Sequence, residues 1–337
     1  MANACGLDCG QCPALARCGG KSNFCLLGRC TDCSASPLMR MDVRRSVIDH
    51  LGSLDLVWPR PVTHNQLVDL PIHLPVLVQA YADPLDLRWV ALHAGRVFGL
   101  AGNAPTPKHR RSLRDVYGLA PRTRLALEFF VEDRVLEGVW AHRRQLMPEL
   151  KDLGFDLILS PNFSVWRDHS RFEQLVQQRR SFAFYHELRE AGLPAIPDVG
   201  WSLFEPDGRL WAEWINGQPD LRAVSIFCGG RKIHAERRAF RETAEDIALF
   251  HRAVRPDVTF VLGGIHAPER LLALRQAAPG RQLVICNGMA YALAQRRRLL
   301  NQRATAARSA RECFLLNCAF NDRVYAQILN QEALRVA

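Results

Sequence analysis

Seven cysteines lie within the first 33 residues, at spacings typical of metal ligands. Glycines between them let a short chain fold around a metal ion, and too few large apolar residues lie there to form a core. Metal–thiolate bonds would therefore have to supply the folding free energy of this segment. The sequence predicts a metal-binding module over residues 1–36, with the ligands Cys5, Cys9, Cys12, Cys18, Cys25, Cys30 and Cys33.

Several centres fit these thiolates. Cys5, Cys9 and Cys12 supply three ligands in eight residues, and Cys18 is available as a fourth, which favours an iron–sulfur cluster of the [4Fe-4S] type. The two C-x2-C pairs of the module alternatively suit one tetrahedral zinc ion, and a redox-active thiol cluster is a further alternative. The first triplet also has the spacing of radical S-adenosylmethionine enzymes, although no expected strand precedes it. A radical-type iron–sulfur enzyme therefore stays open as a hypothesis.

The overall composition is that of an ordinary globular protein. The chain has 337 residues, of which 48% are hydrophobic and 23% charged, enough for one large α/β domain with an appendage. No run of 18 apolar residues occurs, and the N-terminus lacks the basic start and apolar run of a signal peptide. We therefore expect no membrane partner and a cytoplasmic location, where reduced cysteines favour metal binding over disulfides.

The charge favours a polyanionic partner. The net charge is +10 and arginine far outnumbers lysine, so DNA, RNA or a phosphorylated small molecule is the expected ligand. Residues 289–311 contain six arginines and no carboxylate. On a helix this run would form a surface of one sign suited to a phosphate backbone, with a solvated outer helix as the alternative. The oligomeric state is not indicated.

The elements that would position these groups begin after a proline-rich connector, predicted over residues 37–85. From residue 86 to 325, short apolar runs alternate with longer helical patterns, which predicts a parallel sheet buried on both faces. This fits a TIM-type (β/α)8 barrel, and a doubly wound open sheet is the alternative. Strands are expected over 89–92, 125–130, 155–159, 193–196, 223–227, 258–262 and 283–286, and helices over 171–191, 235–253, 268–277 and 290–307.

A barrel carries its site at the carboxyl ends of the strands. Asp198 and His266 each follow an apolar strand and are the candidate acid–base groups of a shared pocket. The alternative is that Asp198 caps the next helix and that His266 is structural. His93, and Glu128 or Glu132, also lie at strand ends, and no role is assigned to them.

Glycine marks several of these strand ends, where it exposes backbone N–H groups to an anion. A plain strand-to-helix turn is the alternative. The candidate substrate-binding residues at these ends are Gly229, Gly230, Arg231 and Asn287. The four cysteines outside the module, Cys228, Cys286, Cys313 and Cys318, are expected to be buried core residues, with a ligand or nucleophile role as the alternative.

Residues 156–201 are the most distinctive part of the chain. They contain Ser160-Pro161-Asn162-Phe163-Ser164, then Trp166-Arg167-Asp168, a helix with arginine and tyrosine, Gly192, Pro194, Pro197 and Trp201. This pattern resembles a bacterial family of unknown function carried on phages, plasmids and other mobile elements, over roughly residues 150–250. The resemblance implies a mobile-element setting and a site around Asn162, Arg167 and Asp168, but no activity.

The chemistry of that segment suits a ligand with bases or phosphates. Asn162 and Arg167 are candidate substrate-binding residues, Asp168 is a third candidate catalytic group, and Trp201 offers an aromatic face for a base. The leading hypothesis is a metal-binding barrel enzyme that acts on nucleic acid, a nucleotide or another phosphorylated substrate, with the reaction unspecified. The second hypothesis is a non-catalytic nucleic-acid-binding accessory protein of a mobile element.

Overall fold

The computed structural model describes residues 47–58, 69–81, 83–99, 101–106, 112–165, 171–201, 207–229, 236–300 and 308–330. All that follows concerns these residues. The predicted metal module of residues 1–36 lies outside them.

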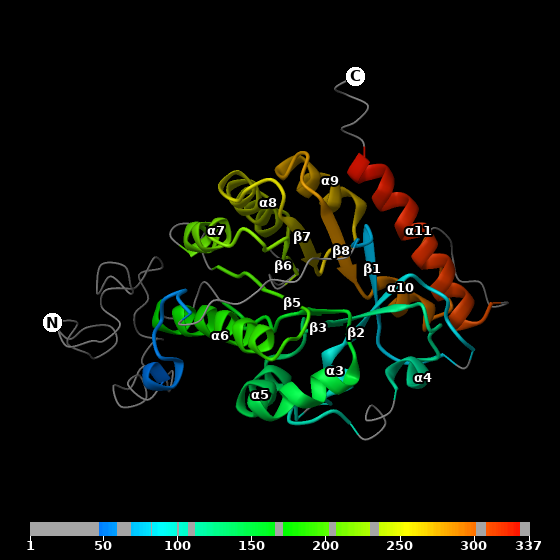
Figure 1. Cartoon of the computed structure of the whole chain (residues 1–337). Coiled ribbons are helices and arrows are strands. Elements are labelled where there is room, and N and C mark those ends of the chain that lie inside the picture. The colour runs from blue at the N-terminus through cyan, green and yellow to red at the C-terminus, as the bar shows by residue number, and fades with distance from the viewer. Residues whose placement is uncertain are drawn as a thin grey trace.

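Eight parallel strands form the centre of the molecule (Figure 1). They are β1 (His73–Leu77), β2 (Trp89–His93), β3 (Arg124–Glu128), β4 (Leu157–Leu159), β5 (Ala195–Ile196), β6 (Ala223–Phe227), β7 (Thr259–Gly263) and β8 (Leu283–Asn287). Their hydrogen-bonded order is β5-β4-β3-β2-β1-β8-β7-β6. Strands that follow each other in sequence are therefore paired, except β5 and β6 at the two ends of this order, and β1 also pairs with β8.

A short backbone bridge joins the two outer strands of this order. Ser225 of β6 donates its N–H to the carbonyl of Pro197 at 2.8 Å, and its own carbonyl accepts from the N–H of Val199 at 2.9 Å. The sheet is therefore a nearly closed eight-stranded barrel, consistent with the TIM-type fold expected from the sequence and not with an open doubly wound sheet.

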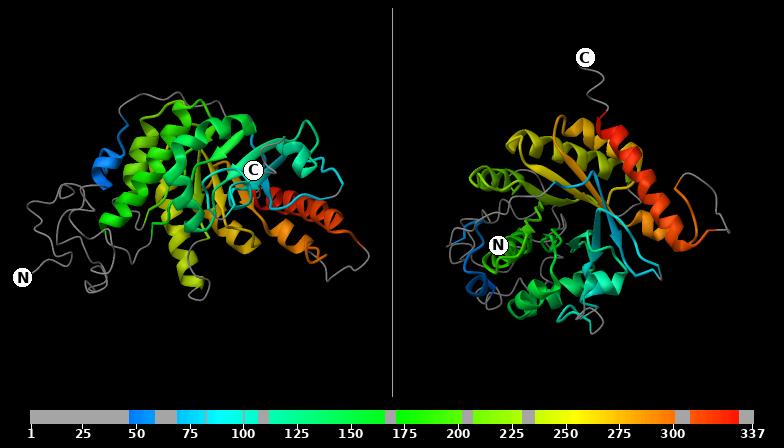
Figure 2. Two further views of the ribbon diagram at one scale, coloured as in Figure 1. Left: turned by 90° about the horizontal axis from the view of Figure 1, so that it is seen from below. Right: turned by 45° about the vertical axis from the view of Figure 1, so that its right-hand side comes forward.

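Helices lie around the outside of the strands, as the turned views in Figure 2 also show. They are α3 (Ala94–Val97), α4 (Leu113–Tyr117), α5 (Asp133–Leu153), α6 (Arg171–Glu190), α7 (Arg209–Asn216), α8 (Glu236–Ala253), α9 (Pro268–Ala277), α10 (Met289–Ala294) and α11 (Ala310–Asn330). No helix in the described part of the chain is both long and apolar enough to cross a lipid bilayer.

The helix expected over 290–307 is wrong as one continuous element. α10 ends at Ala294, and Arg297 adopts a φ of 50°, a left-handed conformation that an α-helix does not tolerate. Arg296, Arg297 and Arg298 therefore lie in a turn after α10, whereas Arg308 stands just before α11.

Strand β1 lies inside the segment that the sequence analysis assigned to a connector. Pro75 is part of β1 and pairs with Asn287 of β8. Proline has no N–H to donate and is rare inside central strands, so its presence disguises this strand in the sequence.

The barrel interior is filled with apolar side chains, among them Leu74, Ala91, Ala126, Leu159 and Val261. Cys286 belongs to this core, and the other three cysteines of the described residues are likewise buried and free of disulfides. No group of three or more His, Cys, Asp or Glu side chains that could hold a metal ion occurs in the described residues.

Helix α6 carries several polar side chains that are buried, and one of them, Arg179, holds residues 47–58 against the helix. The guanidinium of Arg179 donates to the carbonyls of Leu51 at 3.1 and 3.2 Å, Asp55 at 2.8 Å and Val57 at 2.7 Å. The carbonyl of Leu51 ends a helical turn and would otherwise be unpaired. Arg179 thereby fixes this segment on the barrel.

Candidate active site

Four consecutive strands bring polar side chains to their carboxyl ends. His93 ends β2 and lies level with Glu128 at the end of β3, Asn162 follows β4, and Asp198 follows β5. The carboxyl ends of parallel strands meet at one mouth of a barrel. This half of the mouth, which we call the polar half, is therefore defined by His93, Glu128, Asn162 and Asp198.

Asp198 is a buried carboxyl, only 1% exposed. It accepts a hydrogen bond from the hydroxyl of Ser225 at 2.8 Å and another from the side-chain amide of Asn162. Burial raises the pKa of Asp198 to about 7, although both hydrogen bonds act in the opposite direction. A carboxyl with such a pKa exchanges its proton near neutral pH, as acid–base groups of enzymes do.

Glu128 is a second buried carboxyl of the polar half. One of its oxygens accepts the N–H of Phe130 at 2.7 Å, and the other lies 3.8 Å from Nε2 of His93. Burial raises the pKa of Glu128 to about 8. Burial and the charge of Arg96 lower the pKa of His93. At neutral pH the two side chains therefore form a contact between neutral groups rather than an ion pair.

His93 and Arg96 line the outer part of the mouth. The side chain of His93 is 31% exposed, and its buried Nδ1 has no hydrogen-bond partner within the described residues. Arg96 is exposed on α3, directly after β2, and forms no ion pair with any residue that the structure describes. A guanidinium in this position is available to an anionic ligand.

The opposite half of the mouth is closely packed, because Phe130, which follows β3, reaches across to residues of β6 and β7. The rings of Phe130 and Phe227 stack with centroids 5.0 Å apart, and a Cβ on Gly263 would lie 2.3 Å from the ring of Phe130. A Cβ on Gly264, whose φ is +76°, would lie 2.8 Å from the Cα of Gly229. Close packing therefore explains why glycine occurs at these positions, without an anion-binding role.

The structure joins some of the predicted site residues and separates others. Asp198 and Asn162 are hydrogen-bonded to each other. His266 is exposed after β7, and no hydrogen bond or ion pair connects it with the buried Asp198 in the structure described. Asn287 donates to the hydroxyl of Tyr325 at 3.0 Å and accepts from the N–H of Met289, which is a structural role.

The other predicted residues contribute less to the mouth as described. Trp201 packs against Phe250, with ring centroids 4.9 Å apart. Gly229 is exposed at the end of β6. The predicted residues Arg167, Asp168, Gly230 and Arg231 lie outside the described residues, as do the seven cysteines of residues 1–36.

Sequence reasoning located Glu128 and His93 at strand ends without giving them a role. The alternation of side chains along β3 indicates where Glu128 points. Ala126 faces the barrel interior, and a residue two positions later in a strand faces the same side. Glu128 therefore points inward where a solvated carboxylate would not be expected.

Comparison with known proteins gives two matches. A family model described as a domain of unknown function (DUF4417) matches residues 114–269, a range that includes Glu128, Asn162 and Asp198. The "Gene 1 protein" of Mycobacterium phage D29 is 28% identical over 123 residues, which is 36% of this chain and 43% of the phage protein. The chain thus spans less than half the length of this relative. The middle of the barrel is similar to a domain family without a described activity and to a phage protein, and the finer motif likeness stays a prediction.

Proposed function

We propose that the chain is a barrel enzyme that uses buried carboxyl groups for proton transfer on a phosphate-bearing substrate. The observation that carries this proposal is the pair of buried carboxyls at the mouth, Asp198 and Glu128, whose pKa values burial raises to about 7 and about 8. Two titratable groups with such values can divide the acid and base roles of one reaction between them.

The local geometry supports distinct tasks for the two groups. Asp198 is held by Ser225 and by the partly exposed Asn162, so its carboxylate is oriented as a proton acceptor toward the mouth. Glu128 is protonated at neutral pH and is a proton donor. Neutral His93, 3.8 Å from Glu128, is placed to pass a proton between Glu128 and a ligand.

The substrate class rests on charge. The net charge of +10 favours a ligand that carries phosphate, as does Arg96 beside His93, since this arginine has no ion-pair partner in the part of the chain that the structure describes. Nucleic acid, a nucleotide and a phosphorylated small molecule share this chemistry. The reaction would proceed at the polar half, since the other half is filled by Phe130 and Phe227.

The test compares wild type with Asp198→Asn on a panel of nucleotides and short oligonucleotides, with products followed by mass spectrometry. We expect a product whose formation is at least about 100-fold slower with the variant, the range of general acid–base catalysis. Asp257→Asn, a surface carboxylate paired with Arg222 and Arg255, is the matched control. Equal rates for Asp198→Asn and wild type, or no conversion of any phosphate compound, would contradict the proposal.

For residues 1–36 we propose a metal centre held by the seven cysteines, with a [4Fe-4S] cluster as the first expectation and zinc as the alternative. The support is the thiolate spacing. Anaerobic purification followed by metal analysis and a visible spectrum tests it. Absorbance near 400 nm with about four irons per chain identifies a cluster, and a colourless protein with zinc excludes both the cluster and a radical reaction. A chain with neither metal refutes the proposal.

A further inference from the structure

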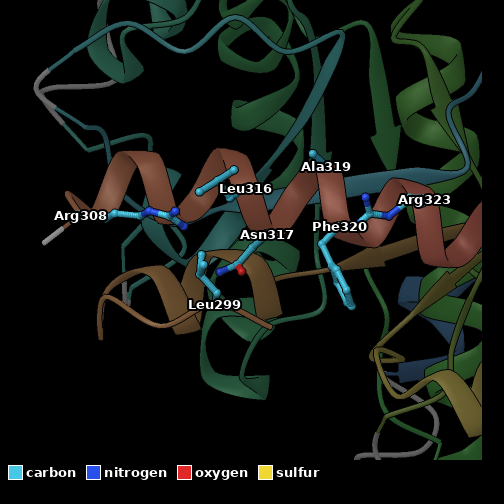
Figure 3. Close-up of a pocket in the computed structure, with 7 residues that line it drawn as sticks. All are labelled: Leu299, Arg308, Leu316, Asn317, Ala319, Phe320 and Arg323. Carbon is cyan, nitrogen blue, oxygen red and sulfur yellow. The ribbon is translucent and has the colours of Figure 1, made fainter. Parts of the chain in front are cut away.

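A groove lies on the outside of the barrel, between α11 and the turn that follows α10 (Figure 3). Its volume is about 230 Å³. Leu299 lies on the side of the turn, and Leu316, Ala319 and Phe320 lie on α11. We call this feature the α11 groove.

The α11 groove is held in shape by Asn317. The side-chain amide of this buried residue donates to the carbonyls of Ala290 at 3.2 Å and Arg298 at 3.0 Å, and its oxygen accepts the N–H of Leu300 at 2.9 Å. The turn after α10 is thereby tied to α11. A groove fixed by three hydrogen bonds loses little conformational entropy when a ligand binds.

Arginines surround the α11 groove. Arg308 and Arg323 stand at its opposite ends (Figure 3), and the three arginines of the adjoining turn are exposed: Arg296, Arg297 and Arg298. None of these five forms an ion pair with a residue that the structure describes.

Two carboxylates of α11, Glu312 and Asp322, lie near these arginines and offset only part of their charge. Glu312 accepts from the N–H and the hydroxyl of Ser309, at 2.8 and 3.0 Å. Asp322 lies 3.1 Å from Nδ1 of His73. Both acidic groups of this part of α11 thus have other partners. The hydrogen bonds from Ser309 lower the pKa of Glu312, and the charge of Arg308 acts on it in the same direction. The five arginines nevertheless outnumber the two carboxylates, and the groove keeps a net positive charge.

The shape and polarity of the α11 groove indicate which class of ligand it binds. Leu316 is the only lining residue among the exposed large hydrophobic side chains, whereas an amphipathic helix in a groove needs several such anchors. The volume is below the roughly 300–1,000 Å³ of sites that enclose a small molecule. A charged chain lying across the surface fits better than either.

The geometry points to a single strand of nucleic acid as that chain. Arg308 and Arg323 are 15 residues apart, which corresponds to about 22 Å at the 1.5 Å rise per residue of a helix, and they would contact separate phosphates. Half-buried Phe320 lies between them in the sequence. The guanidinium carbon of Arg323 is 5.8 Å from the centre of the Phe320 ring. It provides the aromatic platform on which a base stacks in strand-binding grooves. This inference is independent of the proposed acid–base function.

The experiment measures fluorescence anisotropy of labelled 12-mers of oligo-dT and oligo-U, and of a mixed-sequence duplex, over a range of salt concentrations. Arg308→Gln with Arg323→Gln is expected to weaken single-strand binding at least tenfold and to lower the slope of log affinity against log salt by about 1.4, since about 0.7 is lost per phosphate contact. Phe320→Leu should weaken binding about fivefold or more without changing this slope.

Arg144→Gln with Arg252→Gln is the matched control, because it removes two exposed arginines from α5 and α8, away from the groove. Equal effects of the two double variants would overturn the inference, as would wild-type affinity in Phe320→Leu. Tighter binding of the duplex than of either single strand would also overturn it. The oligo-dT and oligo-U arms distinguish DNA from RNA as the source of the strand.

Discussion

Replacement of Asp198 by asparagine should stabilise the protein at alkaline pH, although it should slow the proposed proton transfer. Burial raises the pKa of this carboxyl from 3.8 to about 7, and each pKa unit corresponds to about 1.4 kcal/mol. Ionised Asp198 at pH 8 therefore destabilises the folded state by about 4 kcal/mol relative to its protonated form.

The direction of the pH effect follows from proton binding. Between pH 4 and 7 the folded state holds a proton on Asp198 that the unfolded state has lost, so the free energy of unfolding falls as the pH rises through this window. Asparagine is neutral throughout and still accepts from Ser225, while the amide of Asn162 can turn to present its oxygen. The variant should match wild type near pH 4 and exceed it at pH 8 by up to about 4 kcal/mol.

Urea unfolding followed by tryptophan fluorescence at pH 5 and pH 8 measures this difference, with equal m-values as the condition for comparison. Asp257→Asn is the control with the opposite pKa shift, because Arg255 and Arg222 lower the pKa of Asp257. Removal of this carboxylate should not stabilise the protein at any pH. A variant at Asp198 that is less stable than wild type at pH 8 would refute the reasoning.

Three further substitutions test the packing of the mouth and the attachment of the N-terminal segment. Glu128→Gln should also be more stable than wild type, by a margin that grows as the pH rises from about 4.5 to about 8, because burial raises the pKa of Glu128 from 4.5 to about 8; a pH titration of the melting temperature measures this. Gly263→Ala should destabilise by about 1–3 kcal/mol through contact with Phe130; Phe130→Ala in the same chain should restore part of the loss in urea unfolding. Arg179→Met leaves the carbonyls of residues 51, 55 and 57 without their donor, so limited proteolysis should cut residues 47–58 faster, and wild-type resistance would contradict this.

Regular parts of the fold were predictable because their patterns are local. Residues 223–227 and 268–277 are predicted and observed with the same bounds, as β6 and α9. β1 was missed since Pro75 contradicts strand propensity, and only its pairing with β8 shows that it belongs to the barrel. The turn at Arg297 was missed for a related reason, because nothing in the local sequence shows that the helical pattern ends after Ala294.

The candidate site was predictable in part. Asp198 and Asn162 were both selected for their positions after strands, and the hydrogen bond between them follows from the adjacency of β4 and β5. The alternation of β3 indicates that Glu128 points inward, but its raised pKa could not be predicted, because it results from burial by residues distant in the sequence. His266 was selected by the same positional rule, but its side chain is exposed.

The bridge between β5 and β6 has a consequence for local opening of the barrel. This joint rests on the hydrogen bonds around Ser225, and Asp198 accepts the hydroxyl of the same residue. Opening the joint would admit water to the buried carboxyl and favour its ionisation, so by linkage ionisation must favour opening. Between about pH 4 and 7, amide hydrogen exchange at Val199 and Ser225 should therefore accelerate by more than the intrinsic chemistry requires, and above pH 7 it should follow the intrinsic chemistry alone. The pH dependence of exchange at the β5–β6 bridge would thus report the charge on Asp198.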